Sequence, residues 1–370
     1  MALKVGVVGL RGIGSSHTDC YSKNPLAKLV AVCDVHKDRA DDLAARYNVK
    51  KYYSLKDMLA NEDLDIVDVS TGGYENGSWH YEPAMQAMDA GKHVLVEKPI
   101  SNDIACAREM VAKAYEKNVY LGCNLNHYFT PTAEKAKKHM TDGHVGELVY
   151  CLHKMGFNGG EETYNPNQGS RFGGHKYAHL KAFLTHPFSV MRFFCGDITH
   201  LQAFVDKTGI RRHAGDAMLS IASIHCRFEN GAVGYLLSQR GDVAYGLGGW
   251  WSVEVAGTRG TFCIENCIEK MTFWPAPTPT SGSMMGQTAT SEVFESGTAD
   301  FGVTFPNRIH AFLEDITNGV PKEKLRASGR DALAVLEYTW ATMESFEQGG
   351  ILVRPHPLPL LKGDPIAMKD

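Results

Sequence analysis

The sequence lacks a long hydrophobic run and an excess of charge of either sign. No stretch reaches the roughly 18 consecutive apolar residues that a membrane-spanning helix requires, because even the apolar segment at 188–195 contains Arg192. The 38 basic and 42 acidic residues give a formal net charge of -4, which offers no electrostatic attraction for nucleic acid or an anionic membrane. The sequence therefore predicts a soluble globular protein whose partner is a small molecule.

The sequence also lacks a disulfide pattern. Its nine cysteines are an odd number at irregular spacings, which in a chain of 370 residues favours free thiols in a reducing compartment. Cys263 and Cys267 are interpreted in the same way. No basic leader is present, since Met1-Ala2-Leu3-Lys4 runs directly into the apolar stretch 5–10, which predicts a strand and not a signal peptide. We therefore expect a cytoplasmic protein.

The first third of the chain alternates short β-rich apolar runs with helical patterns. Strands are expected at 4–8, 28–33, 65–70, 93–96 and 119–123. One intervening helix is expected to start near Asp103, behind a cap at Ser101 or Asn102. This alternation predicts the α/β class, with a Rossmann-type doubly wound parallel sheet in a domain spanning 1–126.

The pattern changes after residue 126. Helical patterns at 131–141 and 176–195 precede expected strands at 198–206, 217–228, 232–240, 250–256 and 261–265, with hairpin signals at 229–231 and 257–260. These predict a C-terminal α+β domain spanning 127–370, built on a large, mostly antiparallel open sheet. The stretch 275–302, rich in Pro, Thr, Ser and Gly, is consistent with a lid, an oligomer arm or a mobile excursion. A final helix is expected over 331–346.

A glycine-rich turn follows the first expected strand. Gly9, Gly12 and Gly14 surround Arg11 and Ile13, where backbone amides and a helix N-terminus can hold a pyrophosphate. The spacing is irregular, because G-x-G-x-x-G would place its second glycine where Arg11 stands. Asp34 closes the second strand 20 residues after Gly14, where a carboxylate accepts hydrogen bonds from a ribose 2′-hydroxyl. The alternative is a structural turn with a surface aspartate, but the combination favours NAD over NADP.

Glu97-Lys98-Pro99 stands at the carboxyl end of the fourth expected strand, the edge at which open α/β sheets bind ligands. The ammonium group of Lys98 could hydrogen-bond a substrate hydroxyl there and stabilise the alkoxide as hydride leaves the carbon. The alternative is an exposed lysine in a turn.

In order along the chain, these segments resemble the glucose-fructose oxidoreductase / inositol dehydrogenase (Gfo/Idh/MocA) family of nicotinamide-dependent dehydrogenases. The first strand, the glycine turn and the following His17 match the family's opening, and residues 90–99 match its most diagnostic segment nearly throughout. Asn126-His127 with Phe129-Thr130-Pro131 matches the entry to the family's second domain. The resemblance covers most of the chain and leaves 275–302 as an individual feature.

The resemblance implies roles for particular residues. Catalysis is assigned to Lys98 and His186, because an imidazole can accept a hydroxyl proton near neutral pH. Binding of NAD is assigned to Gly9, Arg11, Gly12, Ile13, Gly14, Asp34, Val35, Thr71, His80, Glu97, Lys98 and Asn126. The resemblance also implies a homo-oligomer, a dimer or tetramer, associated through the open face of the second-domain sheet.

Two departures from the family pattern concern the mechanism. With His186 aligned to the catalytic histidine, Ala182 stands where the family's carboxylate would be, and Tyr128 occupies a common arginine position. His175, His179 and Lys181 on the same segment are candidates to replace the missing acid. Asn158 and Arg171 lie in a segment rich in glycine, asparagine and aromatic residues that suits sugar binding. The His175-x-x-x-His179 spacing would also suit a metal pair, but we expect no metal, because no acidic or cysteine partner lies nearby in the sequence.

These observations predict an NAD-dependent dehydrogenase that oxidises a secondary hydroxyl of a sugar, sugar derivative or cyclitol, or reduces the ketone. A first alternative is a redox-neutral enzyme, an epimerase, lyase or glycosidase, that retains its NAD through a transient keto intermediate. A second is a ligand sensor that kept the dinucleotide fold and lost catalysis, which the alanine at position 182 makes conceivable. The surviving Lys98 argues against the sensor.

Overall fold

The computed structural model describes residues 2–74, 77–157, 175–209, 212, 217–241, 248–280, 283–287 and 290–358. The chain forms two compact units, and the first break falls between Asn126 and His127. The first unit contains Met1–Asn126 and also Gly302–Leu336, whereas the second contains His127–Phe301 and Glu337–His356.

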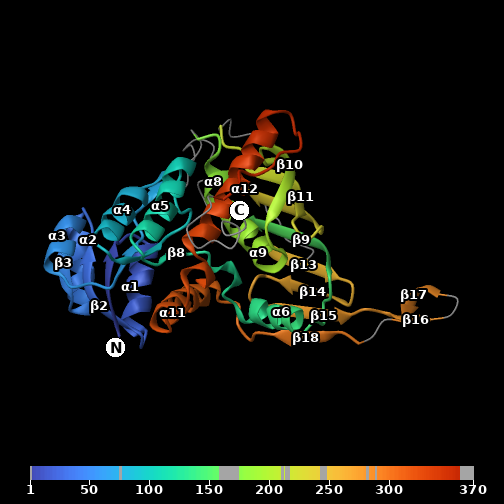
Figure 1. The fold of residues 1–370 in the computed structure, drawn as a ribbon, viewed down its shortest axis with the longest axis horizontal. Helices are drawn as coiled ribbons and strands as arrows, with labels where there is room; N and C mark the ends of the chain where they lie inside the picture. Colours follow the sequence, from blue (N-terminus) through green and yellow to red (C-terminus); the bar gives the residue numbers. More distant parts are fainter. Residues whose placement is uncertain are drawn as a thin grey trace. The chain divides into compact units, whose positions relative to one another are not determined.

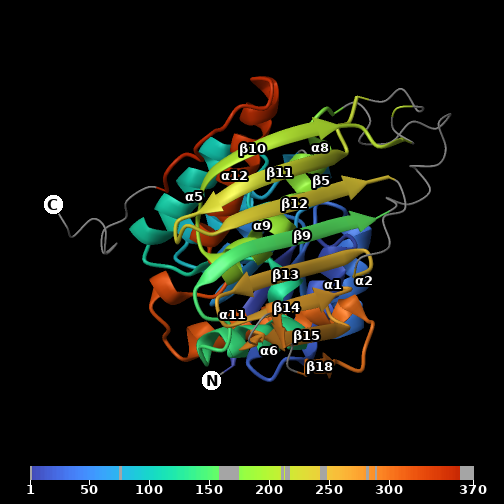
Figure 2. The ribbon, with the colours of Figure 1, turned by 90° about the vertical axis from the view of Figure 1, so that its right-hand side faces the viewer.

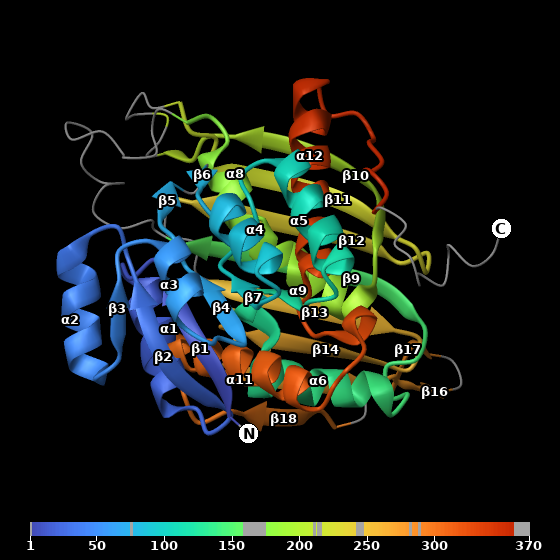
Figure 3. The same cartoon turned by 60° about the vertical axis from the view of Figure 1, so that its left-hand side comes forward.

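The first unit is built on a six-stranded sheet in the order β3-β2-β1-β4-β7-β8, with every pair parallel (Figure 3). The strands are β1 (Leu3–Val8), β2 (Ala27–Cys33), β3 (Lys50–Tyr52), β4 (Ile66–Val69), β7 (His93–Val96) and β8 (Leu121–Cys123). The strand order reverses between β1 and β4, and such a switch point is where doubly wound sheets bind ligands. The predicted fold class is thus confirmed, with β3 as an additional strand.

Helices connect these strands: α1 (Ile13–Lys23), α2 (Lys37–Tyr47), α3 (Leu55–Asn61), α4 (Tyr81–Asp89) and α5 (Ile104–Glu116). The predicted cap of α5 at Ser101 or Asn102 is wrong. Asp103 caps the helix, because its carboxylate accepts hydrogen bonds from the amides of Ala105 at 2.8 Å and Cys106 at 3.0 Å. The hydroxyl of Ser101 accepts a hydrogen bond from the Asp103 amide instead.

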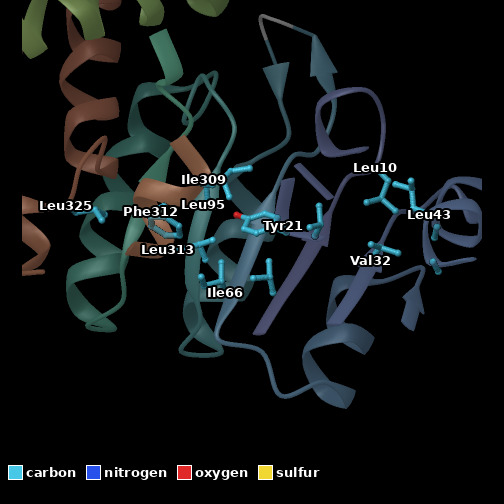
Figure 4. Packing of buried hydrophobic residues seen from close by; sticks show 14 residues of the cluster. Leu10, Tyr21, Val32, Leu43, Ile66, Leu95, Ile309, Phe312, Leu313 and Leu325 are labelled. Atoms are coloured by element: carbon cyan, nitrogen blue, oxygen red, sulfur yellow. The ribbon is translucent and has the colours of Figure 1, made fainter. Parts of the chain in front are cut away.

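Helix α11 (Thr304–Thr317) returns to the first unit and completes its hydrophobic core. Ile309, Phe312 and Leu313 of α11 share one buried cluster with Tyr21 of α1 and Leu95 of β7 (Figure 4). The sequence predicted a single domain boundary at residue 126 and so assigned α11 to the second domain. The apolar stripe of a helix does not specify which sheet the helix covers.

The second unit is built on an eight-stranded sheet in the order β10-β11-β12-β9-β13-β14-β15-β18 (Figure 2). The sheet is antiparallel except for the parallel pair β12 and β9. The strands are β9 (Leu148–Phe157), β10 (Ile198–Asp206), β11 (Ile221–Phe228), β12 (Val233–Arg240), β13 (Trp251–Gly257), β14 (Gly260–Glu265), β15 (Lys270–Pro275) and β18 (Glu292–Glu295). The mostly antiparallel sheet was predicted, whereas β9, β15 and β18 were not.

Helices α6 (Pro131–Thr141) and α9 (Thr185–Cys195) pack on one face of this sheet. The predicted helix at 176–195 is divided into α8 (Ala178–Phe183) and α9. The predicted final helix is α12 (Gly329–Glu347). The opposite face of the sheet exposes apolar side chains from several strands, including Leu152, Phe204, Val233, Trp274 and Val293.

The segment 275–302 contains regular structure. Strands β16 (Thr278–Thr280) and β17 (Ser283–Gln287) form a hairpin that projects beyond β15 and β18 (Figure 1). The next strand, β18, pairs with β15 at the edge of the large sheet. The short elements are β5 (Gly73–Tyr74), β6 (Gly77–Ser78), η1 (Asn126–Tyr128), η2 (Phe301–Val303) and η3 (Lys322–Lys324). Among the described helices, none combines the length and apolar character needed to cross a membrane.

Candidate active site

The glycine turn lies between β1 and α1 and brings backbone very close to backbone. Gly9 has a φ of 87°, and a Cβ there would lie 2.5 Å from the backbone of Thr71. A Cβ on Gly14 would lie 1.7 Å from the carbonyl oxygen of Gly9. Gly12 precedes α1 with a φ of 39° and no side-chain cap. The turn therefore presents amides and the positive end of an 11-residue helix, as a phosphate group requires.

Asp34 lies directly after β2 and is almost fully buried. One carboxylate oxygen accepts a hydrogen bond from the Leu10 amide at 2.8 Å, and the other accepts one from the His36 amide at 2.8 Å. Each oxygen retains a second acceptor position, which suits a ribose hydroxyl. The next residue, Val35, is 81% exposed, and a guanidinium nitrogen of Arg39 lies 3.8 Å from the Asp34 carboxylate.

Lys98 is the second residue after β7 and lies at the same edge of the sheet. Its backbone amide donates a hydrogen bond to the Glu97 carboxylate at 3.2 Å, and the Asn124 side chain donates another to Glu97. Glu97 is buried and Lys98 is half-buried. The structure therefore places a lysine and a buried carboxylate at consecutive positions of the edge where the glycine turn also lies.

The other predicted cofactor residues of the first unit have protein partners. His80 is buried and its Nδ1 lies 2.8 Å from the Pro99 carbonyl oxygen, so it supports the loop that carries Lys98. Burial lowers the pKa of His80. The Thr71 hydroxyl donates to the Trp79 carbonyl, and the Asn126 amide donates to the Thr304 hydroxyl at 2.7 Å. Arg11 and Ile13 are exposed on the glycine turn.

In the second unit, His186 lies in the first turn of α9 and stacks on His127. The ring centroids are 3.8 Å apart and the planes differ by 21°. The indole nitrogen of Trp251 donates a hydrogen bond to Nδ1 of His127 at 3.1 Å, so this nitrogen carries no proton. The contacts therefore hold His127 neutral, with its proton on Nε2, against one face of His186.

His153 on β9 contacts Trp251 and so adds another aromatic ring to this group. Its ring meets Trp251 edge-on with centroids 4.8 Å apart, and its Nδ1 donates to the Ser252 carbonyl at 2.7 Å. Burial lowers the pKa of His153 to about 4. The sequence assigned no role to His153 and placed Trp251 only in an aromatic segment, 245–251, suited to sugar binding, because the contacts of these residues with each other and with His127 arise from the fold and not from local spacing.

The remaining candidates of the second unit are dispersed. Ala182 is fully buried on α8, and Tyr128 stacks between Phe129 and Phe193. Nε2 of His179 lies 3.3 Å from the Ser238 hydroxyl, and the ammonium group of Lys181 lies 4.7 Å from the Trp340 ring centroid. Asn158 and Arg171 lie outside the described residues.

The structure removes the geometric basis of a metal pair at His175 and His179. Helix α8 begins at Ala178, so His175 precedes it and the two imidazoles do not share a helix face. Within the described ranges, no three His, Cys, Asp or Glu side chains form a group that could hold a metal ion.

Two family models match the chain. The model described as an oxidoreductase family with an NAD-binding Rossmann fold matches residues 3–125, and the GFO/IDH/MocA C-terminal domain matches residues 133–263. Myo-inositol 2-dehydrogenase of Thermotoga maritima is 25% identical over 272 residues, which are 72% of this chain and 76% of the relative.

Two solved structures resemble the whole chain. A levoglucosan dehydrogenase in complex with NADH and levoglucosan superimposes with a TM-score of 0.79 at 20% identity, covering 96% of this chain and 100% of the other. Scyllo-inositol dehydrogenase of Lactobacillus casei, with bound NAD(H) and scyllo-inositol, gives a TM-score of 0.75 at 21% identity over 96% and 99% of the two chains. At these identities the similarity concerns the fold.

Proposed function

Because the chain belongs to the Gfo/Idh/MocA family of NAD-binding oxidoreductases, we propose that it oxidises a secondary hydroxyl group of a sugar, sugar derivative or cyclitol. One observation carries this proposal: the glycine turn, Asp34 and Lys98 occupy the carboxyl edge of a single parallel sheet. This arrangement places a lysine beside a dinucleotide cradle. The substrate class follows the relatives, which include myo-inositol 2-dehydrogenase.

The residues fit NAD. A Cβ at Gly9 or Gly14 would collide with backbone atoms of Thr71 or Gly9, so the two glycines allow the tight turn that presents its amides to a pyrophosphate. Asp34 offers acceptors for the ribose hydroxyls while disfavouring a 2′-phosphate. When bound, NAD supplies an acceptor for the hydride that leaves the substrate carbon. Arg11, Ile13, Val35 and Thr71 complete the proposed cofactor contacts. His80, Glu97 and Asn126 are proposed to hold the segments that carry these contacts.

Lys98 and His186 divide the proton chemistry in this proposal. The Lys98 ammonium donates a hydrogen bond to the substrate hydroxyl oxygen and stabilises the alkoxide that develops there. His186 accepts or relays the hydroxyl proton. His127 stacks on His186 and keeps its own Nδ1 occupied by Trp251, so it orients His186 without competing for the proton. This ring stack takes the orienting role of the carboxylate that Ala182 does not supply.

A panel assay tests the proposal. Purified protein is mixed with NAD or NADP and with myo-inositol, scyllo-inositol, levoglucosan, hexoses, uronates or glycosides, and the absorbance of NADH is followed. We expect NADH to accumulate with NAD and one class of polyol. Mass spectrometry of the purified protein records any retained cofactor and any substrate conversion without net NADH. Conversion without NADH would indicate a redox-neutral enzyme, and NAD binding without any conversion would indicate a sensor.

We also propose a homo-oligomer in which the open face of the large sheet meets a second copy. Leu152, Phe204, Val233, Trp274 and Val293 are between 36% and 62% exposed on strands of this sheet. Exposed apolar side chains gathered on one face of a sheet are typical of a protein interface. All nine cysteines are unpaired, which supports a reducing compartment such as the cytoplasm.

A further inference from the structure

A buried ionic cluster lies beneath Lys98 and joins three elements of the first unit. His17 comes from α1, Asp68 from β4, and Glu97 follows β7. His17 and Asp68 are fully buried, and Glu97 is 8% exposed. Nδ1 of His17 lies 3.1 and 3.0 Å from the two Asp68 oxygens, and Nε2 lies 3.3 Å from Oε1 of Glu97.

The carboxylates on either side of His17 favour its charged form. Each ring nitrogen lies within 3.3 Å of a carboxylate oxygen, which favours a proton on both nitrogens, and the Asn124 side-chain nitrogen also lies 3.2 Å from Nε2. Burial alone would lower the pKa of His17, but the two carboxylates outweigh it and raise this pKa to about 10. His17 is therefore an imidazolium ion enclosed by the fold.

The two carboxylates differ in their other partners. Asp68 also accepts hydrogen bonds from the Tyr21 hydroxyl at 3.0 Å and the Ser70 hydroxyl at 2.6 Å. The charged groups beside Glu97 are His17 and Lys98. Burial would raise the pKa of Glu97, and the hydrogen bond and positive charge of His17 are the main influences that lower it instead. Glu97 thus depends on His17 for its ionisation.

We propose that His17 is a positioning residue for Lys98: it keeps Glu97 ionised, and the Glu97 carboxylate then holds the backbone and attracts the ammonium group of Lys98. The contact from the Lys98 amide to Glu97 at 3.2 Å makes the final link. The action of Lys98 on substrate rests on the proposed function, whereas the influence of His17 on Lys98 through Glu97 does not. A solely structural cluster would bind α1 to the sheet without affecting Lys98.

Other titratable and charged groups surround the cluster. They are Cys20 and Tyr21 of α1, Cys123 of β8, Arg308 of α11, His80 before α4, whose pKa burial lowers, and Lys98 itself. Burial raises the pKa values of Cys20, Tyr21 and Cys123, so these groups are uncharged near neutral pH. The charges that change in the following variants are therefore those of His17, Asp68, Glu97 and Lys98.

The first measurement is nitrogen NMR of the histidine-labelled wild-type protein, with the His17 signals identified by their loss in His17→Gln. We expect both His17 nitrogens to remain protonated at about pH 8, well above the usual titration range of histidine. A neutral His17 at that pH overturns the proposal, and this result needs no variant with altered activity.

The second measurement follows the reactivity of Lys98 in the absence of substrate. Trace acetylation by acetic anhydride across a pH series, quantified on the Lys98 peptide by mass spectrometry, gives the pH at which its amine becomes reactive. Glu97→Gln removes the neighbouring anion, so this pH should fall by about one unit. His17→Gln should cause the same fall, because Glu97 then takes up a proton, and the double variant should match Glu97→Gln alone.

Asp68→Asn is the matched control, because it alters the same buried cluster but leaves Glu97 beside His17. We expect it to destabilise the protein and to shift Lys98 reactivity less than His17→Gln does, because Glu97 still has His17 as its neighbour. An unchanged Lys98 in His17→Gln or in Glu97→Gln overturns the proposal, as does a shift in Asp68→Asn as large as that in His17→Gln. Absence of dehydrogenase activity on every polyol would contradict the proposed function alone, since neither measurement uses a substrate.

Discussion

Lys98 combines a half-buried ammonium group with a buried, ionised neighbour at the end of β7. Such a group can stabilise negative charge that develops on a substrate oxygen, and removing it affects the reaction more than it affects cofactor binding. The cofactor contacts that we propose are centred on the glycine turn and Asp34, at other strands of the sheet.

Substituting Lys98 with Ala tests this separation. We expect turnover to fall by about a thousandfold, within the range typical of general acid–base groups. The NAD dissociation constant, measured by calorimetry, should change less than about threefold. Lys56→Ala, at an exposed lysine on α3, is the control and should resemble the wild type. Wild-type-like turnover in Lys98→Ala would refute the assigned role.

Cofactor preference is expected to depend on Asp34 and Val35. The double variant Asp34→Ser/Val35→Arg should shift the ratio of kcat/KM values toward NADP, because a carboxylate that repels a 2′-phosphate is replaced and a cation is added. Arg39, 3.8 Å from the Asp34 carboxylate, is then released to assist. Val35→Arg alone is the control and should retain a preference for NAD. Unchanged selectivity in the double variant would remove Asp34 from the ribose site.

Sequence patterns identified the residues whose roles are encoded locally. Gly9, Gly14 and Asp34 are specified by their distance from the end of a strand, and the structure places all of them at the same sheet edge. Asp68 was not identified, and Trp251 was interpreted as a sugar-binding aromatic and not as a partner of His127, because these residues meet His17 and His127 across segments distant in sequence. A buried aspartate in a strand and a tryptophan that starts another strand have no characteristic spacing.

At the scale of elements, the junction of β1 and α1 depends on close backbone contact. Gly14→Ala should abolish measurable NAD binding and destabilise the first unit, because its Cβ would lie 1.7 Å from the Gly9 carbonyl oxygen, which cannot move without shifting β1 or α1. Gly12→Ala is the matched control: no heavy atom lies within 4 Å of its Cβ, so its cost is limited to the backbone strain at a φ of 39° and a ψ of -93°, about 2 kcal/mol. Equal effects of the two substitutions on binding and on melting temperature would contradict this account.

The helices and strands whose sequences show a clear hydrophobic period were predicted, and those without such a period were not. Strands β1, β2, β7, β10 and β12 lie within a residue or two of their predicted ranges. Strand β9 was missed, although it lies between β12 and β13 in the middle of the large sheet. Its sequence includes a lysine and a glycine, so the apolar alternation typical of a strand is not clear. The destination of α11 was missed because local amphipathicity does not identify the packing partner.

At the scale of the whole molecule, the two units contain buried histidines with opposite pH behaviour. The pKa of His153 is lowered to about 4, so the unfolded chain binds more protons than the native state between about pH 6.5 and 4. The contribution of His153 to the free energy of unfolding is therefore fully present above pH 6.5 and is lost as the pH falls from 6.5 to 4. The pKa of His17 is raised to about 10, so the native state binds more protons than the unfolded chain between about pH 6.5 and 10. The contribution of His17 to the free energy of unfolding is therefore fully present below pH 6.5 and is lost as the pH rises toward 10.

Substituting His153 with Gln should therefore flatten the acid side of the stability curve. We expect the wild type to lose up to about 3 kcal/mol more than the variant between about pH 6.5 and 4, as measured by denaturant unfolding of the second unit. His225→Gln, at an exposed histidine on β11, is the control and should retain the wild-type slope. Parallel curves for the wild type and His153→Gln would show that the native fold does not lower the pKa of His153.

Assembly is the other property of the whole molecule. Leu152→Lys places a charge on the exposed apolar face of the large sheet, where Leu152 is 45% exposed. We expect this substitution to dissociate the homo-oligomer, since burial of an unpaired charge is strongly unfavourable. Tyr53→Lys on the first unit should leave the assembly intact, and light scattering after size exclusion distinguishes the species. A wild-type protein that is already monomeric would contradict the proposed interface.

The return of α11 also affects how the chain folds during synthesis. The first unit has all six strands once residue 123 has been made, but Ile309 and Phe312 of its core follow more than 180 residues later. Throughout this interval, the surface around Tyr21 and Leu95 that α11 covers in the native structure stays unprotected on the nascent protein. The cofactor-binding unit is therefore not an autonomous N-terminal module, and its maturation on the ribosome must wait until the sequence of the second unit has been translated.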